Sequence, residues 1–584
     1  CTGYKKIIEG ILLAAAILRG EKSIDPELER GDDYGVGKRA FRVDVRRKVL
    51  GYGKYPDDID ERDFPDLTYA SAVRSKHPRA RVVKIDAEKA RAMPGVLAVL
   101  TAADVPVNAV GHLLYDWDVM IAEGDITHCV GDAIALVVAE DAATLEKAKK
   151  AVKVTYEVLE TVRSIEEARA EGAPVLHKPY LAFGNWVTPE NNICQQRHVV
   201  RGDAAAALAG AAHKVTRTFK TPFTEHAFLE PECAVAFPYK DGVKVCSSDQ
   251  GAYDSRKEIA HMLGWDATPE RVVVETMLVG GGFGGKEDVS VQHLAALAAL
   301  AVNRPVKVRL TRQESINFHP KRHYMEGTFT LGCDEDGTFV GLDCEINFDT
   351  GAYASSGTYT TGGAVVRAAE DLVRQIREQA ARVFGVTADD VEFDGESVRC
   401  AGAGGAEQEM TVAALANKLI GFGLHPGMLE GHGTNAQPTS PPPYMAGVAE
   451  VEVDKATGKV TVTDYAAVVD CGTVINPALA RVQAEGGIAQ GIGMALTEQV
   501  SRDERGNLRT GDLMTYKLPT RMDVPEPRVE FMPSFEPTGP FGAKSIGEVV
   551  INTPSPAVMS AVAHATGRYV RDLPITPSKV LLGE

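Results

Sequence analysis

Val272-Val-Val-Glu-Thr-Met-Leu-Val-Gly-Gly-Gly-Phe-Gly-Gly-Lys-Glu287 is the most distinctive stretch of the chain. Its first residues are β-branched and predict a strand, and the glycines around Phe283 predict a loop that leads into a helix. Glycines let backbone N–H groups converge on an anion, and a helix N-terminus adds a favourable dipole. We therefore expect an anionic group to dock here; a tight turn that binds nothing is the alternative.

Two nucleotide-binding patterns match this loop only superficially. Gly280-x-Gly282-x-x-Gly285 satisfies the dinucleotide fingerprint, but the next expected strand, Val306 to Arg309, lacks an acidic residue at its end to hold a ribose. The same stretch resembles a phosphate loop, yet Glu287 stands where Ser or Thr should bind magnesium. Both patterns are weak evidence for a nucleotide.

Composition excludes several classes of protein. The chain has 584 residues, and 80 acidic against 63 basic residues give a net charge of −17, which argues against nucleic-acid binding. With 56 Gly and 31 Pro we expect many turns, few long helices and a strand-rich fold. The nine cysteines form no CxxC pair, so we expect buried thiols in a reducing cytoplasm. The longest apolar run, Ile11 to Leu18, is too short to span a membrane.

Local patterns predict individual elements along the chain. Helices are expected over 4–19, 142–152, 289–302 and 364–383, and strands over 97–100 and 133–138. Asp-Gly or Gly-containing turns predict hairpins at 239–242, 334–337 and 454–458. After Thr358-Tyr-Thr-Thr361 the pattern changes abruptly from strand to helix, which marks a seam in the chain.

Taken together, several segments resemble the xanthine dehydrogenase/aldehyde oxidase family of molybdenum hydroxylases. Gly280 to Glu287 resembles the family's molybdenum-cofactor loop, and Thr224 to Pro231 resembles the strand that precedes it. The remaining matches follow in the family's order: Cys1-Thr-Gly-Tyr4, Ser247 to Gln250, Asp470 to Pro477 with Gln483 to Gly493, and Gly542 to Glu548. The chain is most similar to single-chain forms like the selenium-dependent xanthine dehydrogenases.

This resemblance implies an α+β fold with a defined domain order. Residues 1–38 would be a remnant of a helical [2Fe–2S] domain plus a linker, and residues 39–165 a small hammerhead-like α+β domain. Two large molybdopterin-binding domains would follow over 166–361, truncated near 361, and 362–584. Cys1 would be the last ligand of an iron–sulfur cluster that this chain alone does not complete.

The resemblance also assigns cofactors and partners. The cofactor would be molybdenum–molybdopterin, with a cytosine dinucleotide form and a sulfido or selenido ligand as options, and [2Fe–2S] clusters in the full-length protein. Electrons would pass to an FAD-containing partner subunit. A homodimer is a further expectation, whereas nucleic acid and membrane are not expected partners.

The site residues follow from the same matches. Glu548 would be the general base, since a buried carboxylate with a raised pKa suits proton abstraction near neutrality; a surface glutamate is the alternative. Glu287 would bind the polar edge of a heterocycle; a carboxylate at a helix start is the alternative. Residues expected to contact the cofactor are Gln250, Gly281, Gly282, Phe283, Gly284, Gln483, Ile546 and Gly547.

The expected activity is hydroxylation of a purine or related N-heterocycle with water as the oxygen source. An aldehyde oxidoreductase on the same scaffold is one alternative. The family's Arg-Gly-Phe-Gly loop, which holds substrate and should follow Ala352-Tyr353, is absent. An inactive or carrier-like paralogue is therefore the second alternative.

Overall fold

The computed structural model describes residues 4–23, 31, 34–112, 114–182, 185–187, 192–194, 196–348, 357–401, 407–420, 429–435 and 441–583. Cys1, and residues 349–356 just before the seam, lie outside this described part. Within it, no helix combines the length and apolarity needed to cross a membrane.

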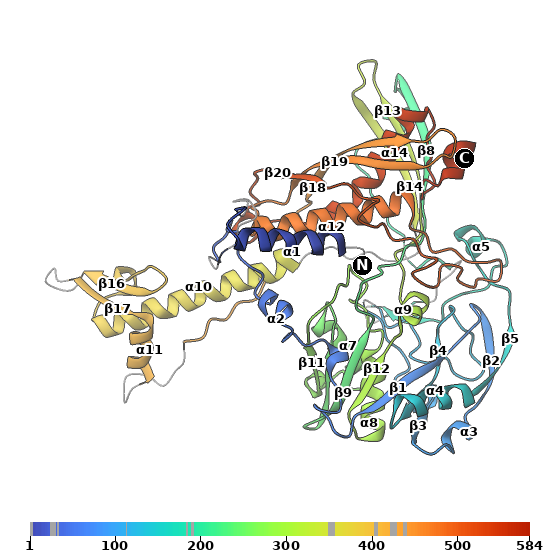
Figure 1. The fold of residues 1–584 in the computed structure, drawn as a ribbon, viewed down its shortest axis with the longest axis horizontal. Helices are drawn as coiled ribbons and strands as arrows, with labels where there is room; N and C mark the ends of the chain where they lie inside the picture. The colour runs from blue at the N-terminus through green and yellow to red at the C-terminus, as the bar shows by residue number, and fades with distance from the viewer. Residues whose placement is uncertain are drawn as a thin grey trace.

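A seven-stranded mixed sheet forms the lower body of the molecule (Figure 1). Its order is β11–β10–β9–β12–β1–β4–β3. Strand β1 pairs in parallel with β12, Thr68 opposite Val306, so strands from 39–165 and from 166–361 share one sheet. The bounds are β1 Thr68–Arg74, β3 Val96–Leu100, β4 Ala133–Ala139, β9 Cys233–Tyr239, β10 Gly242–Ser247, β11 Val272–Thr276 and β12 Val306–Arg309.

Several helices pack on this sheet. α8 (Gln292–Val302) is an Ala/Leu-rich helix whose residues 292–299 are all buried, as expected for a helix apolar on every side. It contacts β9, β10 and β12, while α7 (Ala252–Met262) packs against β11 and α8, and α4 (Ala142–Ala151) against β1 and β4. The sheet therefore holds β11 rigidly, and the glycine loop leaves from the end of that strand.

A second body contains the C-terminal residues. Strands β18 (Tyr444–Val453), β19 (Val460–Asp470) and β20 (Arg528–Phe531) form a sheet covered by α12 (Pro477–Leu496), α13 (Val549–Asn552), α14 (Pro554–Thr566) and α15 (Pro577–Leu582). α12 begins at Pro477 because the Asn476 side chain accepts the Leu479 N–H, 3.2 Å. A Cβ added at Gly487 would overlap Val550, so glycine lets α13 lie close to α12.

A third sheet lies against the C-terminal body. Its strands are β8 (His213–Thr221), β13 (Met325–Cys333) and β14 (Phe339–Phe348), in the order β14–β13–β8. Lys220 of β8 donates its N–H to the Arg571 carbonyl, 2.9 Å, and so joins this sheet to the C-terminal body.

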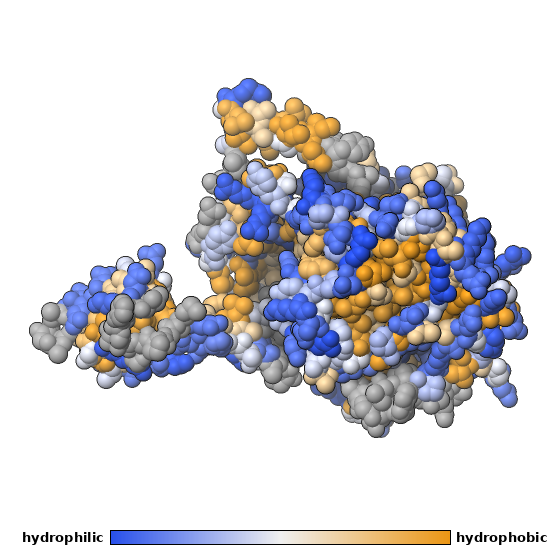
Figure 2. Space-filling view, turned by 90° about the horizontal axis from the view of Figure 1, so that it is seen from below, coloured by the Kyte–Doolittle hydropathy of each residue, from blue (hydrophilic) through white to orange (hydrophobic). Residues whose placement is uncertain are grey.

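A long helix, α10 (Gly357–Phe384), runs out to a small peripheral unit (Figure 1). That unit contains β15 (Glu392–Phe393), β16 (Ser397–Ala401), β17 (Glu407–Thr411) and α11 (Val412–Ile420) around its own small core. Seen from below, the arm stands apart from the main body, on which apolar residues gather (Figure 2).

The remaining elements are short or peripheral. α1 (Tyr4–Leu18) is the first helix of the chain, and most of its described residues are exposed. The others are α2 Val45–Val49, α3 Glu88–Arg91, α5 Ile165–Arg169, α6 Ala204–Ala209, α9 Arg312–Phe318, the strand pair β2 Ala80–Asp86 with β5 Lys153–Val158, and the strand pair β6 Tyr180–Ala182 with β7 Asn185–Val187.

The α+β fold and most of the local predictions are confirmed. The helices at 4–19 and 142–152, the two strands and the three hairpins form within a residue or two of their expected bounds. The expectation of few long helices is wrong, because α10 has 28 residues and α12 has 20. Helices also occupy a larger share of the chain than strands.

Two further expectations are wrong. Thr224 to Pro231 is not a strand: apart from a single bridge at Thr224 it is irregular, with Ala227 at φ 50°, and Pro231 lacks the N–H a ladder needs. The cysteines are not uniformly buried, since Cys194 and Cys344 are exposed.

Candidate functional site

The glycine loop has an unusual backbone. Gly281 and Gly284 adopt φ values of 96° and 89°, and Phe283 between them adopts 54°. Positive φ suits glycine but is strained for a bulky residue, and such strain persists only where the surroundings enforce it. Phe283 is also 53% exposed, so packing in a core does not explain its presence.

Side chains from distant segments fix the loop. Glu230 Oε2 accepts the Gly280 N–H, 2.7 Å, while Gln250 Oε1 accepts the N–H groups of Gly284, 3.0 Å, and Lys286, 3.3 Å. The loop carbonyls are held as well. His319 Nε2 contacts the Gly285 carbonyl, and Arg322 donates to the carbonyl of Phe283, 3.2 Å.

Because of these hydrogen bonds, fewer backbone N–H groups are free to bind an anion than the sequence predicted. The N–H groups of 280, 284, 285 and 286 already have protein acceptors. Among the N–H groups of residues 280–286, those of Gly281, Gly282 and Phe283 have no acceptor within the described residues. The helix dipole does not act at the loop either, because α8 begins at Gln292. A ligand would therefore meet three consecutive donors rather than a full ring.

Gln250, which we expect to contact the cofactor, lies directly against the loop. Its carbonyl oxygen is occupied by two loop N–H groups, so its amide nitrogen is the end available for a ligand. A Cβ added at Gly282 would overlap Gln250 Oε1, which shows how closely the two residues approach. Gln250 and Phe283 are both exposed on the surface of the loop.

Lys286 turns away from this surface. It is 3% exposed, and its Nζ lies 2.9 Å from Glu230 Oε2, 3.2 Å from Ser248 Oγ and 4.6 Å from the centre of the Phe228 ring. Burial lowers its pKa, although Glu230 opposes this shift. A lysine held in the core cannot bind phosphates, so the phosphate-loop interpretation is wrong.

Glu287 and Glu548 approach each other from different bodies. Burial raises the pKa of Glu287, and the charges of Asp288 and Glu548 add to the rise while His112 opposes it. Glu287 is half-buried and lies five residues before α8, so it is not a helix-start carboxylate. Glu548 is exposed and directly precedes α13. The expectation that Glu548 is buried is therefore wrong.

Two segments matched in the C-terminal half lie side by side. Thr473 donates its N–H to the Gly542 carbonyl, 2.8 Å, and Lys544 donates to the Cys471 carbonyl, 2.8 Å. Lys544 Nζ also binds Asp470 Oδ2 at 2.7 Å. Gly472 has φ 69°, and a Cβ there would overlap the Gly542 carbonyl oxygen. These contacts position the segment that leads to Glu548.

The other predicted residues lie on neighbouring elements. Gln483 is exposed on α12, one turn before the glycine that contacts α13. Ile546 packs against the C-terminal core, and Gly547 is half-buried. The linker reaches this region too, because Gly37 donates its N–H to the Ile475 carbonyl, 2.9 Å. Cys1 lies outside the described residues.

A buried polar network beneath the loop was not predicted from the sequence. Tyr516 accepts the Glu225 N–H, 2.8 Å, and donates to Glu498 Oε2, 2.7 Å. Lys321 Nζ lies 2.6 Å from Glu225 Oε2, and His319 lies beside the same carboxylate. The network joins segments about 290 residues apart, and no local pattern signals it.

We expect Glu498→Gln to change how stability depends on pH. Burial raises the pKa of Glu498 to about 7, whereas an unfolded glutamate titrates near ~4.3. Between these values the folded state keeps a proton that the unfolded state releases, so stability falls as pH rises, by at most ~4 kcal/mol. Glutamine keeps an acceptor for Tyr516 but cannot ionise.

The variant should match the parent at pH 5 and be more stable at pH 8 in urea unfolding. The exposed β20 substitution Glu530→Gln serves as the control and should change neither value. A variant that is less stable than the parent at pH 8 would show that the ionised carboxylate stabilises the network.

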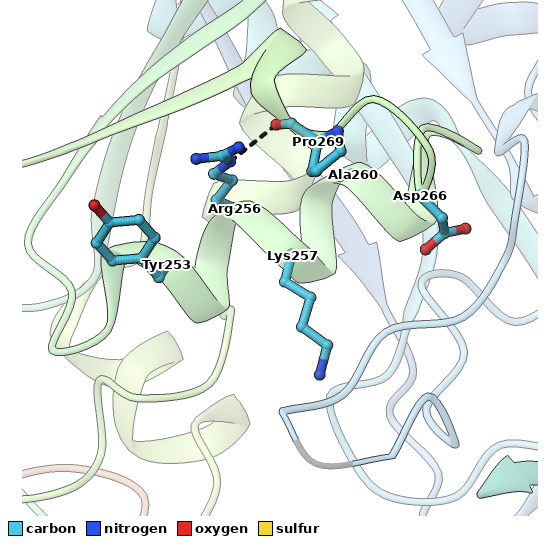
Figure 3. Close-up of a pocket in the computed structure, with 6 residues that line it drawn as sticks. All are labelled: Tyr253, Arg256, Lys257, Ala260, Asp266 and Pro269. Carbon is cyan, nitrogen blue, oxygen red and sulfur yellow. Dashed lines mark hydrogen bonds between the residues drawn. The ribbon is translucent and has the colours of Figure 1, made fainter. Parts of the chain in front are cut away.

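A cavity of about 320 Å³ lies on the outer side of α7 (Figure 3). Arg256 Nε spans it to the Pro269 carbonyl, 3.0 Å, and Tyr253 and Lys257 project from the same helix. Because no glycine-loop residue lines it, we do not assign this cavity to the site.

Comparison with known proteins decides the family. The a/b hammerhead domain of aldehyde oxidase and xanthine dehydrogenase matches residues 50–160, and two molybdopterin cofactor-binding domains match residues 187–419 and 343–525. The nicotinate dehydrogenase large molybdopterin subunit of Eubacterium barkeri is 36% identical over 330 residues, which cover 56% of this chain and 73% of that subunit. The chain belongs to the xanthine dehydrogenase/aldehyde oxidase family of molybdenum hydroxylases.

Other members of this family extend the comparison. A probable hypoxanthine oxidase of Escherichia coli is 24% identical over an alignment of 827 positions, covering 99% of this chain and 85% of the relative. Because 827 exceeds 584, that relative has additional residues inside the matched span. The fold of quinoline 2-oxidoreductase from Pseudomonas putida 86 aligns with a TM-score of 0.80 at 20% identity, covering 95% of this chain and 98% of that chain.

The loop fits a molybdenum cofactor. Within the described residues, three consecutive backbone donors at Gly281, Gly282 and Phe283 have no protein acceptor, and the amide nitrogen of Gln250 is available beside them. No atom of the described residues lies within 4 Å of a Cβ added at Gly284, so a side chain there would have space. This donor set suits oxygen ligands of a metal centre, and the chain contains molybdopterin-binding domains.

Proposed function

We propose that this oxidoreductase hydroxylates a purine or a related N-heterocycle, with water as the oxygen source. The observation that carries the proposal is Glu287, a half-buried carboxylate at the end of the cofactor loop. Burial raises the pKa of this carboxyl group, and the charge of Glu548 adds to the rise. A carboxylate in such a place disfavours substrates that cannot hydrogen-bond to it.

The cofactor would lie against the loop. Phe283 and its two preceding glycines would donate backbone hydrogen bonds, Gln250 would donate from its amide, and Gln483 would contact the pterin from α12. When bound, the molybdenum cofactor supplies the oxidising centre that takes two electrons from the substrate carbon. We further propose a sulfido or selenido ligand and, as one option, the cytosine dinucleotide form.

Glu548 would accept the proton released when oxygen from water adds to the substrate. Gly547 and Ile546 would hold its backbone, since Ile546 is anchored in the C-terminal core. Enclosure by cofactor and substrate would remove water from around this exposed carboxylate and hold it beside the reacting carbon, as a general base requires.

Relatives support the substrate class by their names. One is a nicotinate dehydrogenase subunit, one a probable hypoxanthine oxidase, and one similar fold a quinoline oxidoreductase. All three names denote N-heterocycles. An aldehyde would leave Glu287 without a hydrogen-bonding partner.

Electron transfer requires partners. We propose that [2Fe–2S] clusters, one with Cys1 as a ligand in the full-length protein, pass electrons to an FAD-containing subunit. The named relative is itself a subunit. A cytoplasmic location and a homodimer belong to the same proposal.

Replacement of Glu287 by valine tests the substrate class. The lost charge-assisted hydrogen bond is worth ~1.5–3 kcal/mol, so kcat/KM for hypoxanthine should fall roughly 10- to 150-fold at ~1.4 kcal/mol per decade. Turnover of benzaldehyde should change little, because an aldehyde makes no such bond. The measurement is the ratio of the two kcat/KM values in the molybdenum-loaded chain.

Glu270→Gln, at an exposed carboxylate, is the control and should leave the ratio unchanged. An unchanged ratio in Glu287→Val would remove the N-heterocycle assignment and favour the aldehyde alternative. A loaded chain that oxidises neither substrate would indicate the inactive paralogue.

A further inference from the structure

A segment of the hammerhead domain is fastened onto α7. Gly111 donates its N–H to Glu258 Oε2, 3.0 Å. Four residues later, the Tyr115 ring stacks on His261 of α7, with centroids 3.6 Å apart and planes 5° apart. The Nζ atom of Lys257 also lies over the Tyr115 ring, 5.4 Å from its centre. Figure 3 shows Lys257 projecting from α7. His112 is therefore held between two anchored positions.

The backbone before His112 requires glycine. Gly111 has φ 149°, and a Cβ there would overlap the Leu114 carbonyl oxygen. This close approach fixes the direction in which the chain presents His112 to α7.

Three possible metal ligands converge at this contact. A ring nitrogen of His112 and carboxylate oxygens of Glu258 and Asp288 all lie within 4.8 Å of one another. They come from three different parts of the fold: the hammerhead segment, α7 and the stretch after the glycine loop. The three residues are far apart in the sequence, so only the fold brings them together.

Glu258 is the observation that points to a ligand. It is only 1% exposed, and its Oε1 atom has no hydrogen-bond partner within the described residues. A buried carboxylate oxygen without a partner is costly, so native structures normally pair it with a donor, a proton or a metal.

The surrounding charges also favour a cation. The charges of Asp288 and Asp254 act on Glu258, and Lys257 opposes them. The same two carboxylates also act on Glu287. Acidic groups therefore outnumber basic ones around His112, and either a proton on Glu258 or a bound cation would relieve the repulsion.

The second cluster of this kind does not offer a free site. In the group Glu225, His226 and His319, Lys321 Nζ already lies 2.6 Å from Glu225, and His319 Nε2 contacts the Gly285 carbonyl. A protein cation thus neutralises that carboxylate.

We propose that His112, Glu258 and Asp288 bind one divalent transition-metal ion that fastens the hammerhead segment to α7. Two carboxylates and one imidazole suit Mn²⁺ or Zn²⁺, whereas Mg²⁺ prefers oxygen ligands throughout. Three protein ligands leave coordination positions for water. The site borders Glu287, on which the charges of His112 and Asp288 act, but metal binding by these three residues does not depend on the proposed function.

Manganese binding to the purified full-length chain tests the site. After dialysis against EDTA, Mn²⁺ titration followed by EPR should give one bound ion per chain, with a nitrogen coupling from His112. Zn²⁺ should displace it. His112→Asn should remove the nitrogen coupling, and Glu258→Gln should weaken Mn²⁺ binding at least ~10-fold, about 1.4 kcal/mol.

Glu498→Gln replaces an equally buried carboxylate in the network below the loop and should leave Mn²⁺ binding unchanged. Asp288→Asn provides a second ligand variant if Glu258→Gln does not fold, as judged by circular dichroism. Absence of a stoichiometric ion, or binding that persists with its nitrogen coupling in the folded ligand variants, would overturn the proposal and leave a proton on Glu258 as the explanation.

Discussion

Glu548→Gln should keep its molybdenum content but lose at least ~100-fold in kcat, and up to ~10⁴-fold, the usual range for removing a general base. Glutamine has nearly the same size and can still hydrogen-bond, but it cannot accept a proton. The backbone should stay in place because the Glu548 carbonyl accepts the Ile551 N–H, 3.1 Å, at the start of α13. The loss should therefore appear in turnover and not in folding.

The measurement is kcat for hypoxanthine at saturating substrate, with molybdenum quantified in the same samples. Glu530→Gln, an exposed carboxylate of the same body, is the matched control and should retain full activity. Near-normal turnover in Glu548→Gln would remove this residue from the mechanism.

Local chemistry made much of the fold predictable. The hairpin turn at Tyr239 to Gly242 and the Ala/Leu run of α8 are determined by residues within a few positions of each other. The pairing of β1 with β12 could not be predicted in this way, because Thr68 and Val306 are about 240 residues apart and neither strand encodes its partner. The continuity of the sheet across the expected domains depends on that pairing.

In the site, too, local motifs were predictable and contacts between distant residues were not. Motif resemblance located Gln250, the glycine loop and Glu287, which the structure brings together, and placed Glu548 close enough to influence Glu287. It overestimated the free N–H groups, because Glu230 and Gln250, 50 and 34 positions away, supply side-chain acceptors.

The sequence did not predict the polar residues whose role depends on tertiary packing. Glu498, Tyr516 and His112 stand in ordinary local surroundings, and only tertiary packing makes them buried or brings them to other charged groups. Their burial could not be read from spacing, since isolated polar residues are usually exposed.

Gly282→Ala should release most of the bound molybdenum cofactor. Gly282 has no positive φ, so alanine fits the backbone, but its Cβ would overlap Gln250 Oε1. Gln250 must then move and lose its bonds to the N–H groups of Gly284 and Lys286. Two neutral hydrogen bonds are worth ~1–3 kcal/mol together, or roughly 5- to 150-fold in cofactor affinity.

Molybdenum per chain, measured by mass spectrometry after exhaustive dialysis, tests the claim that this loop holds the cofactor. The parent, Gly282→Ala and Gly10→Ala should be produced in one host that makes the cofactor; Gly10 is the control because a Cβ there meets no atom within 4 Å. We predict about one molybdenum per chain in the parent and in Gly10→Ala, and a several-fold lower content in Gly282→Ala. A parent chain without molybdenum, or equal contents in all three proteins, would contradict this assignment.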